Sequence, residues 1–379
     1  MKITPVIHNR RDHNPHGFRL SLWEKMHLDL PLLLGLGLLI GLGMLILYSA
    51  GGKSLMFLSQ QAMRLGLAAS IMIGLAQIPP QSYRTWAPWL YAVGVILLIA
   101  VLVLGVIGKG AQRWLNLGLF RFQPSELLKL ALPMLLAWYF SDRPLPPKLR
   151  QIGLATLFIL LPAALVAKQP DLGTAILIAG AGFCVLLLAG ISWRLLFGLV
   201  VTIIAIAPLS WHFLKEYQRQ RVLTFLDPER DPLGSGYHII QSKIAIGSGG
   251  LFGKGWLQGT QSHLNFLPEH ATDFIFAVCG EEFGLMGGVV LLSIYAFIIM
   301  RCLQIAIRAQ DTFSRLLAGS LALSFFLYVF INIGMVSGLL PVVGVPLPLV
   351  SYGGTSMVTL MASFGILMSI QTHRRLVAS

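Results

Sequence analysis

The residues best suited to chemistry are carboxylates and cations that lie within or at the ends of long apolar segments. Glu126 and Lys129 are three positions apart, which places them on one face of a helix. Asp273 stands where another apolar segment begins. One carboxylate can take a proton from an attacking hydroxyl, while cations stabilise a departing phosphate. We therefore take these ionisable residues as functional candidates for proton transfer and for binding an anionic group.

Glu126 and Lys129 also have a purely structural interpretation, and so does a further aspartate, Asp171. Glu126 and Lys129 could form a buried ion pair that only fixes the position of a helix. Asp171 follows a proline at the end of another apolar segment and could be only a helix cap. We nevertheless take all three residues as candidates for substrate binding, because charged groups are costly in apolar surroundings.

Asp273 has a structural alternative of its own. It could serve only to start a helix, with Thr272 available as the cap. Glu281 argues for more, because it lies within about 80° of Asp273 around a helix and predicts a polar stripe that runs inward. Glu282 points to the opposite side, and we expect it to pair with another helix.

The composition places these residues in a membrane protein. Of the 379 residues, 56% are hydrophobic and 11% are charged, whereas about 25% is usual for the charged fraction of a soluble domain. The net charge is +13, but the basic residues are scattered between apolar runs, which argues against nucleic acid as a partner. The mean hydropathy of +0.76 excludes disorder. The three cysteines have no spacing typical of a disulfide framework or a zinc site.

Stretches without Asp, Glu, Lys or Arg predict the membrane spans, because a charge at mid-bilayer is costly and a spanning helix needs about 20 residues. The expected spans cover 30–52, 65–83, 85–108, 124–140, 151–167, 172–193, 195–214, about 273–300, and two within 316–373. The span at 124–140 carries Glu126 and Lys129 inside it. The sequence therefore predicts an all-α polytopic membrane protein with about ten transmembrane helices.

The distribution of Lys and Arg predicts the orientation of these spans. Short connectors on the side of the two termini carry most of the basic residues, and the positive-inside rule then places both termini in the cytoplasm. We expect a cytoplasmic tail at 1–28, a single ten-span domain at 29–372 in the cytoplasmic (inner) membrane, and a second cytoplasmic tail at 373–379. The first apolar run is long enough to span, so we expect it to stay as an anchor.

A large extracytoplasmic loop at 213–272 separates the seventh and eighth expected spans. The loop carries Arg219, Arg221 and Lys243, and its segment 237–246 predicts a short amphipathic helix that ends at several glycines. Loops of this length are usually functional or disordered. We expect an ordered lid.

The connector between the last two expected spans is uncharged, yet three prolines prevent it from forming a regular helix. Irregular backbone at membrane depth persists only where it is buried in protein or lines a cavity. We predict a re-entrant segment that lines a cavity; a tight hairpin without a ligand is the alternative. The residues assigned to this feature are Pro346, Pro348, Ser351, Tyr352, Gly353 and Gly354.

Two other features have mainly structural interpretations. The segment 108–123 alternates apolar and basic residues, which suits either an element lying at the membrane interface or an ordinary aromatic-belt loop. His238, His263 and His270 are expected to be surface polar groups, because their spacing fits no metal site.

Several motifs resemble those of one family. They are 122–126 (FQPSE), 169–174 (QPDLGT), 217–221 (YQRQR), 236–250 (GYHIIQSKIAIGSGG), 272–276 (TDFIF) and 346–354 (PLPLVSYGG). In this order they resemble the SEDS family of cell-wall polymerases over about 29–375, and 332–356 resembles the signature pattern of that family. The family usually has histidine directly before Thr-Asp-Phe-Ile, whereas here Ala271 stands in that place. A role for His270, one position earlier, therefore does not carry over.

The resemblance implies a ten-span peptidoglycan glycosyltransferase that polymerises lipid II outside the cytoplasmic membrane during cell elongation and rod-shape maintenance. A class B penicillin-binding protein would crosslink the product, and other proteins of the elongation complex would be further partners. By position, Asp273 matches the catalytic aspartate of the family. Glu126 and Lys129 match its paired residues in the fourth span, and the eighth and ninth spans match its partner-docking surface.

We hypothesise that Asp273 is the base in a single inverting displacement, with the lipid-linked glycan strand as donor and lipid II as acceptor. Lys129, Arg219, Arg221 and Lys243 are the candidates for binding the diphosphates. The reaction needs no organic cofactor, and a divalent cation is an alternative to side chains at the diphosphate.

Two rival functions come from other classes. A flippase for the lipid-linked precursor would also need ten spans and buried charges, and a scaffold would only recruit the crosslinking partner. The outward bias of the candidate residues favours the polymerase, because translocation needs both faces of the membrane.

Overall fold

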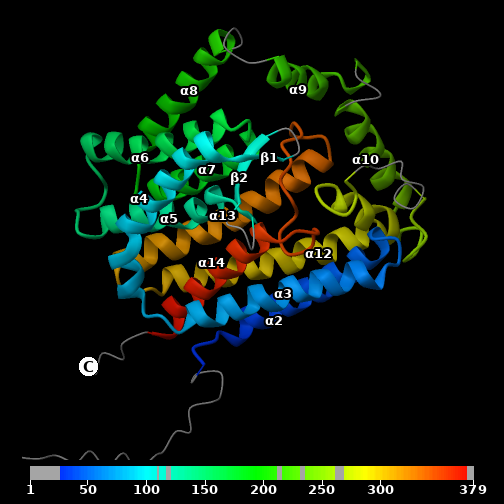
Figure 1. The fold of residues 1–379 in the computed structure, drawn as a ribbon, viewed down its shortest axis with the longest axis horizontal. Helices are drawn as coiled ribbons and strands as arrows, with labels where there is room; N and C mark the ends of the chain where they lie inside the picture. The colour runs from blue at the N-terminus through cyan, green and yellow to red at the C-terminus, as the bar shows by residue number, and fades with distance from the viewer. Residues whose placement is uncertain are drawn as a thin grey trace, which may run out of the picture.

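The computed structural model describes residues 26–108, 111–116, 121–210, 216–230, 235–260 and 269–373, and long α-helices dominate this part of the chain (Figure 1). The helices are α2 (Leu30–Ala50), α3 (Leu55–Ala76), α4 (Pro80–Leu104), α5 (Pro124–Ser141), α6 (Leu149–Lys168), α7 (Leu172–Leu188), α8 (Trp193–Ser210), α9 (Glu216–Leu226), α10 (Ser235–Gly249), α12 (Ile275–Ile307), α13 (Thr312–Val336) and α14 (Thr355–Thr372). The short elements are β1 (Val106–Gly108), β2 (Ala111–Asn116), β3 (Arg121–Phe122) and the 3-10 helix η2 (Pro228–Arg230).

Several helices begin where the sequence supplies a cap. At the start of α2, Asp29 accepts a hydrogen bond from the backbone N–H of Leu32 at 3.0 Å. At the start of α13, Asp311 accepts one from the N–H of Ser314 at 2.9 Å. Each carboxylate satisfies an N–H group that the first helical turn leaves without an intrahelical acceptor.

Ten of the described helices follow the order of the ten expected spans. Six of them have the length and hydropathy of a membrane span: Leu30–Ala50, Pro80–Leu104, Leu149–Lys168, Ile275–Ile307, Thr312–Val336 and Thr355–Thr372. The limits of the expected span at 65–83 are wrong, because this stretch includes the end of α3 and the start of α4. The helix α3 continues through Arg64, whose guanidinium lies 4.5 Å from the centre of the Tyr352 ring. A charge held in this way does not end a helix.

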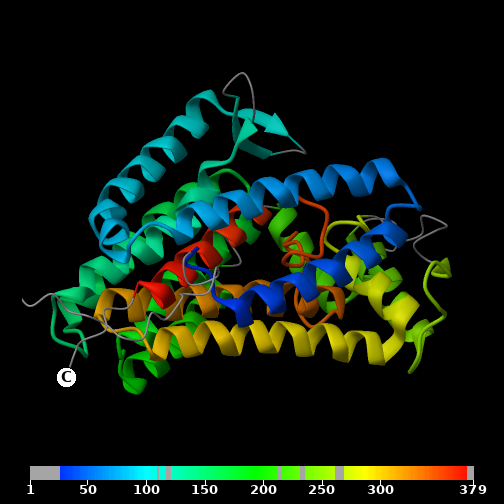
Figure 2. The ribbon, with the colours of Figure 1, turned by 90° about the horizontal axis from the view of Figure 1, so that it is seen from below.

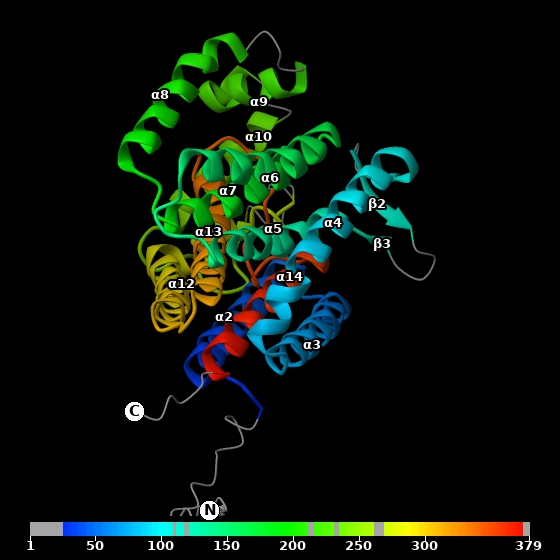
Figure 3. The ribbon, with the colours of Figure 1, turned by 90° about the vertical axis from the view of Figure 1, so that its left-hand side faces the viewer.

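Successive spans reverse direction, so their ends collect on two opposite faces. One face holds both ends of the described chain, residues 26 and 373, and is called the face of the described chain ends. On this face, His27 stacks on His373 with ring centroids 4.0 Å apart. On the same face, Arg301 pairs with Asp29 at 2.6 Å. Figure 2 shows α2, α3 and α12 running along the length of the molecule with α14 among them, whereas α8 stands apart from α12 and α13 in Figure 3.

The core includes a group of packed aromatic rings from α12, α13 and α14. Tyr295, Phe325 and Phe364 are each at most 2% exposed, and successive ring centroids lie 5.8 and 5.1 Å apart. Helix association within a membrane depends on this kind of close packing. Gly43 of α2 extends the packing to the last connector, because a Cβ at this position would lie 3.0 Å from the Cα of Val350.

The segment expected at the membrane interface forms a small antiparallel sheet in the order β1-β2-β3. Leu115 of β2 pairs with Phe122 of β3. Gln112 Nε2 donates to the carbonyl of Gly105 at 2.9 Å, which ties β2 to the end of α4. The alternation of apolar and basic residues is therefore the period of a strand, in which successive side chains point to opposite faces.

Part of the expected lid is an ordered loop that is bound to a kink in α12. The kink lies at Gly284, whose φ of +64° and ψ of −160° are not helical. The N–H groups of Leu285 and Met286 donate to the carbonyls of Gly250 and Leu251 at 2.9 and 3.1 Å. The loop and the helix approach so closely that a Cβ on Gly284 would lie 2.4 Å from the backbone nitrogen of Gly253.

The two glutamates of α12 bind different neighbours at this kink. Glu281 is fully buried and pairs with Lys254 of the loop at 2.7 Å, and it also accepts hydrogen bonds from Thr260. The predicted polar stripe from Asp273 to Glu281 is therefore wrong, because the loop uses this carboxylate. Glu282 accepts a hydrogen bond from Ser49 of α2, which confirms that it contacts another helix.

Replacing Gly284 with Ala is expected to destabilise the fold by about 1–3 kcal/mol, because a residue with a Cβ is strained at positive φ and would press on the loop. Thermal unfolding of the purified protein in detergent measures the change. Gly37→Ala is the matched control, since Gly37 lies in α2 with open space around its Cβ position. Equal unfolding temperatures for the two variants would contradict this account of the kink.

Candidate active site

Asp273 lies just before α12, whose first turn is in the half of the molecule away from the described chain ends (Figure 2). The N-cap of α12 is Phe274, and no side chain caps this helix. The expected capping role of Thr272 is wrong: its hydroxyl donates to Oε2 and to the carbonyl of Glu269 at 2.7 and 3.1 Å. Asp273 is not the N-cap residue either, so helix capping does not account for this carboxylate.

The backbone around Asp273 is held by hydrogen bonds from two other parts of the chain. Asn332 of α13 donates from Nδ2 to the carbonyls of Asp273 and Val345 at 2.8 and 2.7 Å. Ser351 donates to the carbonyl of Thr272 at 2.6 Å. These bonds hold the main chain on both sides of the Asp273 side chain, and Asn332 is fully buried.

The connector between α13 and α14 forms one wall beside the carboxylate. A Cβ on Gly344, which has a φ of +73°, would lie 3.4 Å from Oδ2 of Asp273. The hydroxyl of Ser351 accepts from the N–H of Leu347 at 2.7 Å, and the N–H of Tyr352 donates to the carbonyl of Ala271 at 2.8 Å. The predicted irregular course of this connector is therefore present, and it bends back against the start of α12.

The space beside the connector is small. A void of about 10 Å³ is lined by residues that include Pro346, Pro348, Ser351, Gly353 and Tyr328, and this volume holds about one water molecule. The hydroxyl of Tyr295 donates to the carbonyl of Pro348 at 2.7 Å and holds this part of the connector in place. The cavity that these residues line is thus of water size.

Tyr352 and Ser351 also connect the site to α3. The Tyr352 ring stacks on Phe57 at 4.0 Å, and its hydroxyl donates to Gln60 at 2.9 Å. The guanidinium of Arg64 also lies over the Tyr352 ring. A Cβ on Gly354 would lie 3.8 Å from Cδ of Arg64. Sequence reasoning missed Arg64 because it marked the boundary of a charge-free run, although a cation within an apolar helix is itself a signal of function.

Glu126 and Lys129 form the predicted pair, with Lys129 Nζ 2.7 Å from Glu126 Oε1. Their side chains are 9% and 8% exposed. The ammonium also lies 5.3 Å from the centre of the Tyr328 ring, and Tyr328 lines the void at the connector. Tyr328 therefore joins the pair to the connector that faces Asp273. Within the described residues, the second carboxylate oxygen of Glu126 has no hydrogen-bond partner.

Asp171 has the structural role that its position allowed. Its Oδ1 accepts from the N–H of Thr174 at 3.2 Å and caps α7. Its Oδ2 lies 3.3 Å from Nε of Arg113, and Gln123 donates to the same oxygen at 3.5 Å. The helix cap is confirmed, and a role of Asp171 in substrate binding stays a prediction. Arg113 was not selected from the sequence, because it was assigned to the segment 108–123 expected at the membrane interface.

The three candidate cations of the long loop lie at different places. Lys243 on α10 is exposed and lies against the start of the last connector, where a Cβ on Gly338 would be 2.8 Å from its Nζ. Arg219 is on α9, and Figure 1 places α10 between α9 and α12. Arg221 is on the same helix, but its side chain is outside the described residues. Lys243 therefore lies at the connector, whereas Arg219 lies on another helix, α9.

The histidines of this region differ from the expectation. His238 is half-buried and stacks on Phe274 at 5.5 Å, so it is not a surface polar group. Its contact places α10 against the start of α12, one residue from Asp273. His270 is half-buried as well, and His263 lies outside the described residues. Among the residues described, no group of three or more His, Cys, Asp or Glu side chains could hold a metal ion.

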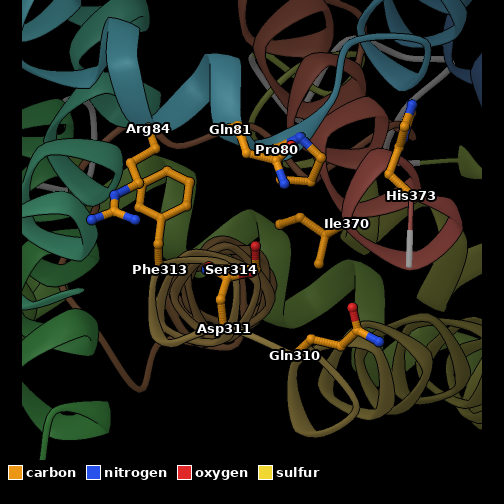
Figure 4. Close-up of a pocket in the computed structure, with 9 residues that line it drawn as sticks. All are labelled: Pro80, Gln81, Arg84, Gln310, Asp311, Phe313, Ser314, Ile370 and His373. Carbon is orange, nitrogen blue, oxygen red and sulfur yellow. The ribbon is translucent and has the colours of Figure 1, made fainter. Parts of the chain in front are cut away.

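A larger pocket lies on the opposite face and contains none of the predicted site residues. It has a volume of about 350 Å³, and its lining includes Arg84, Asp311, Ser314 and His373 (Figure 4). Arg84 is also paired with Asp142 at 2.6 Å. This pocket is therefore separate from the residues around Asp273.

Replacing Ser351 with Ala is expected to lower kcat more than it changes KM, because the lost hydroxyl positions the main chain beside Asp273. It should also cost about 1–3 kcal/mol of unfolding free energy by leaving buried polar groups unpaired. Kinetic and unfolding measurements check the two effects. Ser363→Ala is the control, since this buried hydroxyl bonds only to Leu360 of its own helix. A change in KM alone would contradict the positioning role.

Comparison with known proteins places this arrangement in a family. The model of the cell cycle protein family, which is named for FtsW, RodA and SpoVE, matches residues 24–376. The chain belongs to this family. Within the FtsW, RodA and SpoVE family, the chain is 55% identical to the peptidoglycan glycosyltransferase MrdB of Escherichia coli strain K12, over 96% of this chain and 98% of MrdB.

Solved structures of the FtsW, RodA and SpoVE family have the same fold. RodA of Thermus thermophilus matches with a TM-score of 0.69 and 30% identity, over 90% of this chain and 96% of that one. A chain of a peptidoglycan synthase complex, solved to explain how polymerization and crosslinking are coordinated, matches with a TM-score of 0.80 and 34% identity, over 92% and 99%. The expected resemblance to the SEDS family and to RodA is confirmed, as is the helical polytopic fold.

Proposed function

We propose that this chain is a peptidoglycan glycosyltransferase that polymerises lipid II into glycan strands for cell elongation and rod-shape maintenance. The observation that carries the proposal is the support of Asp273. Two side chains, Asn332 and Ser351, hold the adjacent main chain, and Gly344 lies beside the carboxylate. A carboxylate held in this way costs little reorganisation when it accepts a proton.

The proposed reaction is one inverting displacement. The Asp273 carboxylate takes the proton of a sugar hydroxyl on lipid II, and the hydroxyl oxygen attacks the anomeric carbon of the lipid-linked strand. The new glycosidic bond forms as the bond to the diphosphate breaks, and the lipid diphosphate leaves with the bonding electrons. A single base is enough, because the diphosphate needs no acid to protonate it; a glycosidase, by contrast, uses two carboxylates.

We propose Lys243 and Lys129 as the cations that stabilise the departing diphosphate. Lys243 is exposed at the connector, and Lys129 is linked to the connector through Tyr328. Charge-assisted hydrogen bonds to phosphate are stronger than neutral ones. Arg219 and Arg221, both on α9, belong to the same proposal. Polymerisation measured with and without a chelator decides whether a divalent cation is also needed.

The proposed placement is in the inner membrane, with both termini cytoplasmic and Asp273 on the extracytoplasmic side. The support is the distribution of charge over the two faces. Arg84, Arg301 and Arg308 lie at helix ends on the face of the described chain ends, where the positive-inside rule expects cations. Asp273 lies at the opposite face, where a lipid-linked substrate outside the cell would reach it.

The proposed partner is a class B penicillin-binding protein that docks on α12 and α13. A related chain is part of a synthase complex that coordinates polymerization with crosslinking, and this supports the proposal. Both helices present large exposed apolar side chains: Leu285, Val289, Phe297, Phe326 and Phe330. Other proteins of the elongation complex are expected to bind through this partner or beside it.

Incubation of the purified full-length chain with lipid II tests the proposal. We expect glycan polymers that are resolved by gel electrophoresis, with a lower rate when the crosslinking partner is absent. A flippase would instead move lipid II between the leaflets of a liposome without making polymer. A scaffold would bind the partner and leave lipid II unchanged. Either of these results, with polymer absent in the presence of the partner, would overturn the proposed activity.

A further inference from the structure

A basic groove opens where the connector between α5 and α6 meets the connector between α7 and α8. A Cβ on Gly190 would lie 3.5 Å from Cβ of Pro146, so the two connectors are in contact. The groove has a volume of about 830 Å³. The lining residues that matter here are Lys148, Leu149, Arg150, Gln151, Ser192 and Leu195. It lies on the face of the described chain ends, at the opposite end of the helices from Asp273.

The groove has a net positive charge that the described protein does not neutralise. Lys148 and Arg150 are both exposed, and neither forms an ion pair within the described residues. The connector from 142 to 148 contains one acidic residue, Asp142, which is paired with Arg84 at 2.6 Å. Two unpaired cations on one wall are available to an anionic ligand.

The backbone adds to the positive potential, because α6 and α8 both begin at the groove. Gln151 accepts from the N–H of Lys148 at 2.7 Å, and Ser192 accepts from the N–H of Leu195 at 3.4 Å. The first two N–H groups of each helix have no acceptor one turn earlier in the chain, and the dipole of each helix favours negative charge there. Phosphate groups commonly bind at such helix ends.

The edge of the groove is apolar. Leu149 lines the groove and is 68% exposed; Trp193, next in the chain to the lining residue Ser192, is 83% exposed. Trp residues prefer the depth of lipid headgroups. A soluble phosphate compound would gain nothing from this edge, whereas an acyl chain would cover it.

The groove also lies at the N-terminal end of α8, a helix whose side chains are mostly exposed. Among the α8 side chains that the structure describes, all except Leu196 are exposed. Figures 1 and 3 show α8 apart from α12 and α13. A ligand in the groove would contact the first turns of α6 and α8 together, and would therefore link α8 to the rest of the bundle.

We propose that this groove binds an anionic phospholipid of the surrounding membrane. Lys148 and Arg150 bind the phosphate of the headgroup, and an acyl chain lies along Leu149 and Leu195. Basic pockets between helices are typical sites for the headgroups of anionic lipids. The positive-inside rule explains cations on this face in general, but it does not explain their position beside two helix ends and an exposed apolar edge.

Native mass spectrometry of the purified full-length chain tests this proposal with phosphatidylglycerol as the probe. We expect one tightly retained phosphatidylglycerol molecule. The double variant Lys148→Gln/Arg150→Gln should weaken its binding about 30-fold, because each cation near a membrane surface changes binding about fivefold. The matched control is Arg308→Gln/Arg315→Gln, which removes two exposed cations from the same face outside the groove. The control should retain the lipid.

Further measurements separate the alternatives. Zwitterionic phosphatidylethanolamine should bind at least tenfold more weakly, and glycerol 3-phosphate should not displace phosphatidylglycerol at equal concentration. Equal losses in the two double variants, or equal binding of both lipids, would overturn the proposal. Displacement by glycerol 3-phosphate would show a site for soluble phosphate and would also overturn it. The variant Lys148→Arg/Arg150→Lys keeps both charges and should bind normally, which separates lost charge from misfolding.

Discussion

Replacing Asp273 with Asn is expected to lower the rate of glycan polymerisation by about 10²- to 10⁴-fold, which is the usual contribution of a general base. Asparagine has nearly the same shape, and the hydrogen bonds from Asn332 and Ser351 go to main-chain carbonyls that the substitution leaves in place. The fold should therefore survive. Polymer length and amount after incubation with lipid II measure the effect, and thermal unfolding shows whether the chain is intact.

Glu269→Gln is the control for this prediction. Glu269 is an exposed carboxylate in the same short segment, and an amide oxygen can still accept the hydrogen bond from Thr272. This variant should polymerise at a rate near that of the unchanged protein. An Asp273→Asn variant that matches it in rate would remove the proposed base.

Replacing Lys129 with Met is expected to have the second large effect, a loss of about 3–5 kcal/mol in unfolding free energy. The change leaves Glu126 in a buried position without its cation, and an uncompensated buried charge is strongly destabilising. Chemical unfolding in detergent measures this loss.

The double variant Glu126→Gln/Lys129→Met separates structure from function. Removing both charges should restore most of the stability, because a buried pair replaced as a whole is often nearly neutral. Polymerisation should stay low if the ammonium binds diphosphate. Recovery of both stability and polymerisation would show that the pair only fixes α5 in place, which is the structural interpretation of these two residues.

The sequence predicted the parts of the fold that depend on strong local rules. Long apolar runs indicated the spans, and three prolines indicated the irregular connector, because neither feature depends on distant residues. The error at 65–83 arose because charges were treated as boundaries. Arg64 stays inside α3 through its contact with the Tyr352 ring, a residue almost 300 positions away in the chain.

The site was predicted only as far as single side chains suggest chemistry. Glu126 and Lys129 could be paired from their spacing alone. The residues that hold the main chain around Asp273 could not be predicted in this way. Asn332 and Ser351 donate hydrogen bonds to main-chain carbonyl groups, which every residue possesses. The same limit explains the wrong polar stripe, because Lys254 reaches Glu281 from a loop whose course depends on glycines at the kink.

The bond between the N–H of Tyr352 and the carbonyl of Ala271 has an evolutionary consequence. Main-chain bonds of this kind are indifferent to the side chain that the residue carries. Either alanine or histidine at position 271 can therefore supply this carbonyl. Variation directly beside a reactive group is then no sign that the reaction itself has changed.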